Sequence, residues 1–236
     1  PLDYPAGVNS EASVRKVSTS FSVDETRALL QEAPAATGAR MQEFLLTALA
    51  QSWGSWTGQR RLLVDVEGHG REYILENVDL SRTVGWFTSV YPVSLDLDNA
   101  IGPGEALRNI QAQMRRVPNR GIGFGLLRYL CDDEEVRERI SAAPRAEVNF
   151  NYLGQLDQKG TNRSGTPFRL ARENKGPERS LRGRRSYRLY VVGSVRGGVL
   201  RMHWNYSANL YRRSTIERLA ASFDEELRRL IAICNQ

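Results

Sequence analysis

The stretch Leu62-Leu-Val-Asp-Val-Glu-Gly-His-Gly-Arg-Glu72 carries the most informative signal in this chain. Its first five residues form an apolar run that is typical of a buried strand. A turn with two glycines follows, and glycine is used where the backbone needs an unusual conformation or where another group approaches closely. Glu67 and Arg71 therefore emerge together at the end of a strand. A carboxylate in that place can act as a general base if its surroundings suit proton transfer.

Strands and helices interleave along the rest of the chain. Alternation of apolar and polar residues predicts further strands at residues 13–23, 87–97 and 146–153, and a hairpin at 187–195 and 199–206. Apolar periodicity and capping-box spacing, at Ser22 and again at Ser214, predict helices at residues 22–33, 40–56, 105–117, 124–130, 134–141 and 214–231. Pro92 indicates an edge strand or a bulge, because proline cannot donate to a sheet ladder. The pattern predicts an α/β fold in which helices cover a mixed sheet.

The composition is that of an ordinary globular protein. The chain has 236 residues, of which 25% are charged and 41% are hydrophobic. No apolar run approaches the roughly 18 residues that span a membrane, so we expect no membrane partner. Cys131 and Cys234 lie far apart without metal-ligand spacing, which fits two isolated thiols in a reducing cytoplasm.

The net charge of +6 is concentrated in one segment. Between Arg163 and Arg188 there are nine Lys or Arg against two Asp or Glu, so the remainder of the chain is close to neutral. The segment is also rich in Gly, Pro and Ser, which predicts a long irregular loop. Few aromatic residues lie among its arginines, and a base-stacking platform for nucleic acid is therefore not expected.

Four motifs in order carry a family resemblance. They are Glu67-Gly-His-Gly-Arg-Glu72, Arg82-Thr-Val-Gly-Trp-Phe-Thr-Ser-Val-Tyr-Pro92, Pro118-Asn-Arg-Gly-Ile-Gly-Phe-Gly125 and Asn149-Phe-Asn-Tyr-Leu-Gly-Gln-Leu-Asp157. With them, residues 1–236 resemble the second half of an epimerization domain of a non-ribosomal peptide synthetase, within the condensation-domain superfamily. The resemblance implies a chloramphenicol-acetyltransferase-like fold, of which this chain is the C-terminal subdomain.

The other half of the implied site is not in this sequence. The family's His-His-x-x-x-Asp-Gly motif belongs to the N-terminal half, whereas the two histidines here, His69 and His203, are not adjacent. We therefore expect the chain to need that N-terminal half as a partner, and to be inactive alone.

The resemblance implies an isomerase that makes D-amino acids for antibiotic or other secondary-metabolite biosynthesis. Its substrate is an aminoacyl or peptidyl thioester on the phosphopantetheine of a peptidyl carrier protein, with neighbouring synthetase modules as further partners. Removal of the α-proton gives a planar enolate, and return of a proton to the opposite face inverts the centre. That chemistry requires no metal or redox cofactor in the site.

Glu67 is the residue expected to transfer the proton, with a histidine of the absent half opposite. Without the resemblance, Glu67 could equally cap a strand end or pair with Arg71. Arg71 either orients Glu67 or holds a wall of the channel. His69, between two glycines, is favoured as a hydrogen-bonded structural residue, and no second ligand at helical spacing supports zinc.

Asn151 and Tyr152 either line the channel, where an amide and a phenol could bind the thioester carbonyl, or stabilise the turn and the core. Trp86 is either a core residue or a substrate contact. Gly121, Gly123 and Gly125 lack the context of a phosphate loop and are expected to let backbone pass closely.

Two rival functions remain open on the sequence alone. One is a condensation domain that forms an amide bond, which residues 67–72 argue against. The other is a non-catalytic module that docks carrier proteins.

Overall fold

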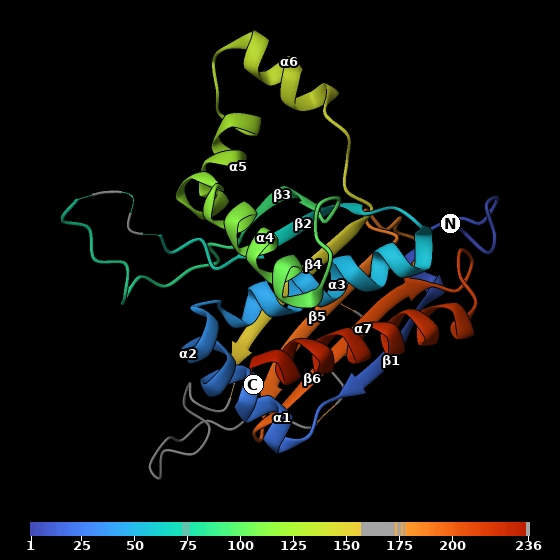
Figure 1. Ribbon diagram of the computed structural model, residues 1–236. Coiled ribbons are helices and arrows are strands. Elements are labelled where there is room, and N and C mark those ends of the chain that lie inside the picture. The colour runs from blue at the N-terminus through green and yellow to red at the C-terminus, as the bar shows by residue number, and fades with distance from the viewer. Residues whose placement is uncertain (73, 75, 157–172, 174–175, 177, 235–236) are drawn as a thin grey trace.

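A computed structural model describes residues 1–72, 74, 76–156, 173, 176 and 178–234. Its centre is one six-stranded sheet with the order β1-β6-β5-β4-β2-β3 (Figure 1). The pairs β1–β6, β5–β6 and β2–β3 are antiparallel, whereas β2–β4 and β4–β5 are parallel, so the expected mixed sheet is confirmed. The strands are β1 (Val14–Ser20), β2 (Arg61–Gly68), β3 (Ser89–Asp96), β4 (Val148–Gln155), β5 (Leu189–Arg196) and β6 (Val199–Ser207).

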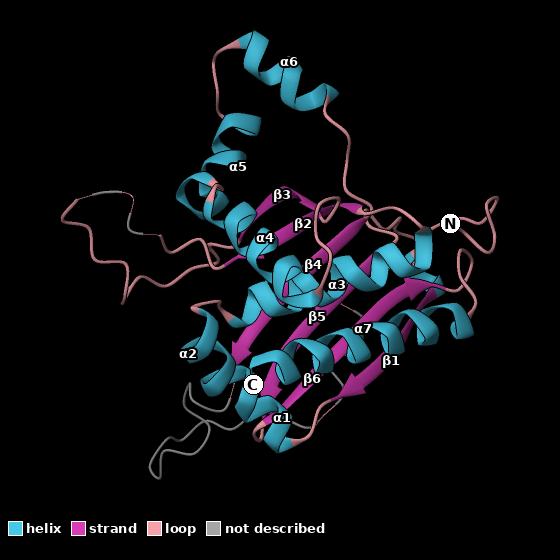
Figure 2. Ribbon diagram, viewed as in Figure 1, coloured by secondary structure: helices cyan, strands magenta, loops and turns pink. Residues whose placement is uncertain are grey.

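Helices lie against one face of this sheet, as Figure 2 shows. Ser22 and Glu25 form the expected capping box at the start of α1 (Val23–Arg27). The helical path then continues through a π-helical turn (Ala28–Glu32) and through α2 (Ala33–Thr37), beyond the predicted end at residue 33. The predicted box at Ser214 is wrong, because the last helix already begins at Arg213. The α-helices are α1 (Val23–Arg27), α2 (Ala33–Thr37), α3 (Met41–Thr57), α4 (Pro103–Arg115), α5 (Ile122–Tyr129), α6 (Glu134–Ala142) and α7 (Arg213–Cys234).

The core lies between the sheet and the pair α3 and α7. Helix α3 is apolar nearly all round because it is enclosed by the sheet, α4 and α7, and Phe44, Leu45 and Leu49 are fully buried in it. Helix α7 buries a single stripe, from which Phe223 meets Trp204 of β6 edge to face at 5.3 Å. An aromatic pair of this kind adds about 0.5–1.5 kcal/mol beyond its buried area. Helix α5 packs beside the edge strand β3, and α6 lies beyond α5, away from the sheet (Figure 1).

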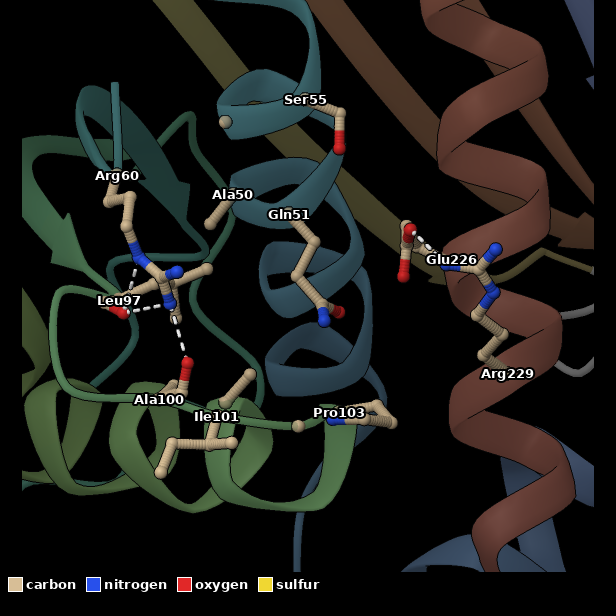
Figure 3. A pocket seen from close by; sticks show the side chains of 13 residues that line it. Ala50, Gln51, Ser55, Arg60, Leu97, Ala100, Ile101, Pro103, Glu226 and Arg229 are labelled. Carbon is tan, nitrogen blue, oxygen red and sulfur yellow. Dashed lines mark hydrogen bonds and ion pairs between the residues drawn. The ribbon is translucent and has the colours of Figure 1, made fainter. Parts of the chain in front are cut away.

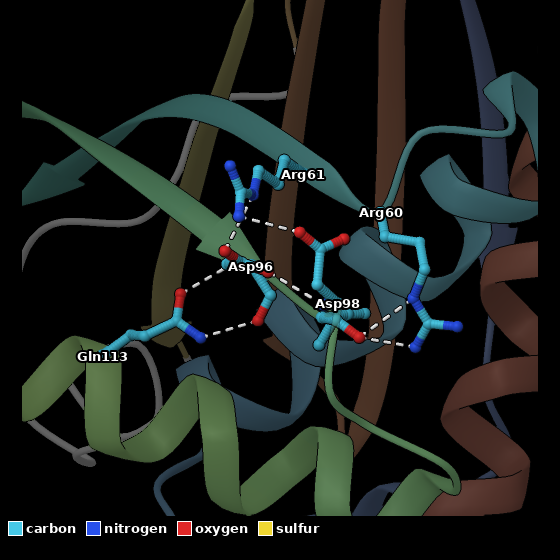
Figure 4. A network of polar contacts seen from close by, with 6 residues as sticks. Arg60, Arg61, Asp96, Asp98 and Gln113 are labelled. Carbon is cyan, nitrogen blue, oxygen red and sulfur yellow. Dashed lines mark hydrogen bonds and ion pairs between the residues drawn. The ribbon is translucent and has the colours of Figure 1, made fainter.

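Strand β3 lies at the edge of the sheet, where Pro92 costs no ladder hydrogen bond to a further strand. A polar network fixes this edge to α4 (Figure 4). Arg61 pairs with Asp96 and Asp98 at 2.8 Å each, and Gln113 of α4 exchanges two hydrogen bonds with the backbone of Asp96. The network fixes the start of β2 and so the direction in which its far end points.

The predicted hairpin joins β5 to β6 through Gly197 and Gly198, whose φ angles of 61° and 71° are the positive values that a tight hairpin needs. Half of the basic segment lies outside the described residues. Its described part consists of residues 173, 176 and 178–188, and strand β5 begins directly after it.

The two faces of the sheet differ in polarity, and this difference positions the site. Leu62, Val64 and Val66 of β2 are buried against the helices. Asp65 and Glu67 alternate with them and face the opposite side, because successive side chains of a strand point to opposite faces.

Candidate functional site

The Glu67 carboxylate is held by two hydrogen-bond donors from two other strands. Asn151 Nδ2 of β4 donates to Oε2 at 2.5 Å, and the Tyr190 hydroxyl of β5 donates to Oε1 at 2.9 Å. Each carboxylate oxygen therefore has its own donor. Glu67 lies one residue from the carboxyl end of β2 and is partly exposed, so the group is fixed but reachable.

The register of the sheet explains why these three side chains meet. Strands β2, β4 and β5 are parallel neighbours, and Asp65 pairs with Asn149, which pairs with Tyr190. Glu67 and Asn151 each lie two residues farther along their strands and so share the same face. Tyr190 lies on the far side of β4, level with Asp65 and so two residues short of Glu67. Its ring therefore reaches across β4 and along the strand direction to Glu67.

A second carboxylate–tyrosine pair lies on β2 two residues before Glu67. The Tyr187 hydroxyl donates to Asp65 Oδ2 at 2.7 Å. Burial, followed by the hydrogen bond to Asp65, raises the pKa of Tyr187 well above its usual range. Asn149 lies between the two pairs and is buried.

The Tyr190 phenol stays protonated at neutral pH. Burial raises its pKa most, and the negative charge of Glu67 and the hydrogen bond to it raise it further. A neutral phenol beside an ionised carboxylate is a donor, which agrees with the geometry.

A cavity of about 420 Å³ lies on the helix side of the sheet, between α3, α4 and α7 (Figure 3), and a cavity of about 520 Å³ opens beside Glu67. The cavity on the helix side contains none of the residues predicted for the site. Its charged side chains are paired with groups of the protein itself: Arg60 donates to backbone carbonyls, and Arg229 pairs with Glu226. The cavity beside Glu67 is the candidate site, since it joins the held carboxylate to open space.

The wall of the Glu67 cavity comes from β5, β6, the segment before β5, and the chain around the start of β1. Tyr190, Asn205, Arg179 and Arg185 contribute polar groups. Burial lowers the pKa of Arg185, whose guanidinium donates to the Asn205 carbonyl at 3.1 Å. Arg179 pairs with Glu11 at 3.3 Å.

Arg71 is directed away from Glu67. Its guanidinium donates to the carbonyl oxygens of Leu80 at 3.0 Å and Gly85 at 3.3 Å, and it lies 4.6 Å from the centre of the Phe87 ring. Within the described residues it makes no contact with the Glu67 carboxylate. Of the two roles considered for Arg71, holding the wall formed by the loop between β2 and β3 fits this placement.

His69 belongs to a separate polar cluster at the same turn. Its Nδ1 accepts from the Arg71 backbone at 2.9 Å, and its Nε2 lies 3.3 Å from Glu72, which also pairs with Arg120 at 3.3 Å. Gly70 has a φ of +65°, and a Cβ there would lie 1.5 Å from the Phe87 carbonyl oxygen. These contacts fit the hydrogen-bonded structural role expected for His69.

Tyr152 and Trp86 are not brought to Glu67. Tyr152 follows Asn151 directly, so its side chain points to the opposite face and packs against the core, where burial raises its pKa to about 12. Trp86 is 90% exposed on the loop between β2 and β3, which differs from a core placement. Only Asn151 of the predicted companions contacts the carboxylate.

Tyr190 is the residue that the sequence analysis missed. Alternation placed it correctly within a strand, but the order of the strands was not predicted, so its cross-strand partner stayed unknown. A polar residue on the otherwise apolar start of β5 was the one available signal.

Metal-ligating side chains do not gather in the described part of the chain: no group of three or more His, Cys, Asp or Glu could hold an ion there. The described helices include none long and apolar enough to cross a membrane.

Comparison with known proteins places this geometry in a family. The condensation-domain family model matches residues 1–236. One of the linear gramicidin synthase proteins of Brevibacillus parabrevis is 42% identical over 99% of this chain, which spans only 3% of that protein.

Two solved structures extend the comparison. The epimerization domain from the third module of tyrocidine synthetase B superposes with a TM-score of 0.88 at 31% identity, over 99% of this chain and 51% of that one. The structure that describes condensation domain-mediated chain release from the enacyloxin polyketide synthase gives a TM-score of 0.64 at 12% identity, over 97% of this chain and 42% of that one, a likeness of fold alone. The expected chloramphenicol-acetyltransferase-like fold is confirmed. The chain belongs to the condensation-domain family of non-ribosomal peptide synthetases.

Proposed function

We propose that this chain is the C-terminal half of an epimerization domain that inverts the α-carbon of an aminoacyl or peptidyl thioester. The substrate is carried on the phosphopantetheine of a peptidyl carrier protein. The observation that supports the proposal most is the Glu67 carboxylate, held by two donors and open to a cavity of about 520 Å³. The greater structural similarity to an epimerization domain than to the condensation domain of the enacyloxin system supports the same choice.

The reaction needs a base with a fixed direction of approach. Glu67 takes the α-proton: the C–H bond breaks, an O–H bond forms on the carboxylate, and the electron pair passes into the thioester as an enolate. A second group then returns a proton to the opposite face of the planar carbon. In the reverse direction the two groups exchange roles.

The second proton-transfer group is proposed to come from the N-terminal half of the domain. Within the described residues, the groups that contact Glu67 are Asn151 and Tyr190, which hold its oxygens rather than face it across a substrate. Inversion needs a proton-transfer group on each side of the α-carbon, and this chain supplies the one on the Glu67 side.

The test uses the chain joined to its own upstream half, with a partner carrier protein loaded with an L-aminoacyl thioester. In deuterated water we expect deuterium at the α-carbon and a rising D/L ratio. Glu67→Gln keeps the size of the side chain and one acceptor oxygen, but its amide nitrogen accepts neither a hydrogen bond nor the α-proton, so both signals should fall at least about 100-fold.

Glu147→Gln is the matched control, because Glu147 is also a carboxylate at the sheet but is exposed and pairs with Arg188 at 2.7 Å. It should retain the full exchange rate. If the joined wild-type domain shows no exchange and instead forms an amide when a second loaded carrier is added, the proposal is wrong and the chain is half of a condensation domain. Carrier binding with neither reaction would identify a docking module.

A further inference from the structure

Tyr190 contacts the same carboxylate as Asn151 but comes from a different strand and binds the other oxygen. Its hydroxyl lies 2.9 Å from Glu67 Oε1, whereas Asn151 Nδ2 lies 2.5 Å from Oε2. A glutamate side chain at a strand end has three rotatable bonds and, with one donor, can still pivot about that contact. Two donors on two oxygens fix the plane of the carboxylate as well as its position.

The Tyr190 ring is itself fixed by the sheet. Its backbone is paired with Asn149 on one side and Asn205 on the other, and Asn205 Nδ2 donates to the Tyr190 carbonyl at 3.3 Å. The ring also lines the cavity beside Glu67. The hydroxyl is therefore delivered from a central strand, which is a more rigid support than a loop.

We propose that Tyr190 is a positioning residue for proton transfer: its hydroxyl, together with Asn151, holds the Glu67 carboxylate in the orientation that meets the α-proton. This inference rests on the proposed function. It predicts that loss of the hydroxyl affects the chemical step and leaves the affinity for the carrier-bound substrate nearly intact, because small errors in the position of a base are costly only in the transition state.

The Thr19–Asp224 pair is a built-in control, whereas Tyr187 is unsuitable because it lines the same cavity as Glu67. The pair has the same chemistry, a hydroxyl that donates to a carboxylate at 3.0 Å, but it lies between β1 and α7 and outside the cavity. Removal of either hydroxyl costs the protein one hydrogen bond of the same type, so an effect on folding alone would be similar for both.

The experiment measures α-proton exchange by the joined domain in deuterated water, as a function of the concentration of loaded carrier protein. We expect Tyr190→Phe to lower kcat about tenfold or more with KM within about twofold, because a hydrogen bond to an ionised group is lost. Thr19→Val, which removes the hydroxyl of the control pair, should stay within about threefold of the wild type. Replacement of Tyr190 by 4-aminophenylalanine, which restores a donor at the same place, should recover most of the lost rate.

Three outcomes decide the matter. Equal kcat for Tyr190→Phe and wild type overturns the inference, as does an equal loss in Thr19→Val, which would indicate a role in structure alone. If Tyr190→Phe does not fold, failure of the folded 4-aminophenylalanine variant to exceed one-tenth of the wild-type rate also overturns it. If the wild-type joined domain shows no exchange, the proposed function fails, which the wild-type measurement alone reveals.

Discussion

Asp224 lies between α7 and β1, where its Oδ1 accepts a hydrogen bond from Thr19 Oγ1 at 3.0 Å. The residue is 9% exposed, and burial raises its pKa to about 6, although Thr19 and Arg228 act in the opposite direction. The unfolded chain binds this proton only below about pH 4. The folded protein therefore binds one proton more than the unfolded chain between about pH 4 and pH 6, and its stability falls as the pH rises through that range.

Asp224→Asn should therefore stabilise the chain at neutral pH. Asparagine still accepts from Thr19 but carries no charge to bury, so we expect a gain of about 1–2 kcal/mol in the free energy of unfolding at pH 7.5. The gain should shrink toward zero at about pH 3, where the aspartate is neutral in both the folded and the unfolded state. Urea unfolding at both pH values checks this, with exposed Asp24→Asn as the control. A gain that does not depend on pH would contradict the prediction.

The three glycines of the motif Gly121-Ile-Gly-Phe-Gly125 serve different purposes at the start of α5. Gly121 has a φ of +81°, and a Cβ there would lie 2.1 Å from ring atoms of Tyr91. An added Cβ at Gly123 or Gly125 meets nothing within 4 Å. Gly121 therefore allows a close approach, but to the Tyr91 ring and not to neighbouring backbone, and the expectation is wrong for Gly123 and Gly125, which lie within the helix.

Gly121→Ala and Gly123→Ala should consequently change stability in opposite directions. Alanine at 121 must adopt a left-handed conformation and displace Tyr91, so we expect a loss of about 2–4 kcal/mol in the free energy of unfolding. Alanine at 123 removes only the entropic cost of glycine in a helix and should gain up to about 1 kcal/mol. Denaturant unfolding of the two variants decides between this account and a shared role, which would give losses of similar size.

Local signals in the sequence predicted most elements, because periodicity, capping and proline act within a few residues. The buried helix at 41–57, the edge strand with Pro92 and the Gly197-Gly198 turn are examples. The register between strands could not be predicted, since it depends on pairing between segments far apart in the chain. Glu67 was found through its motif, whereas Tyr190 lies 123 residues away. The motif suggested both Asn151 and Tyr152 for the site. Adjacent side chains of a strand point to opposite faces, however, so only one of the two can face Glu67.

At the scale of the whole molecule, the sheet has one face for stability and one for chemistry. Helices α3 and α7 bury the apolar face, which gives the chain its own core. The opposite face carries the polar side chains of the parallel strands β2, β4 and β5, and the cavity beside Glu67 opens on it. Folding and the proposed proton transfer therefore make separate demands on the same strands.

This separation predicts that the chain alone folds but does not catalyse. The isolated chain should unfold cooperatively in urea, because its core does not depend on the polar face. It should incorporate no α-deuterium from a loaded carrier protein, since inversion needs a proton-transfer group on each side of the carbon and Glu67 supplies one. Joining the N-terminal half should create the activity without a large change in the unfolding of the helical layer. Exchange by the isolated chain would contradict the prediction and would require both proton transfers to occur on this one polar face.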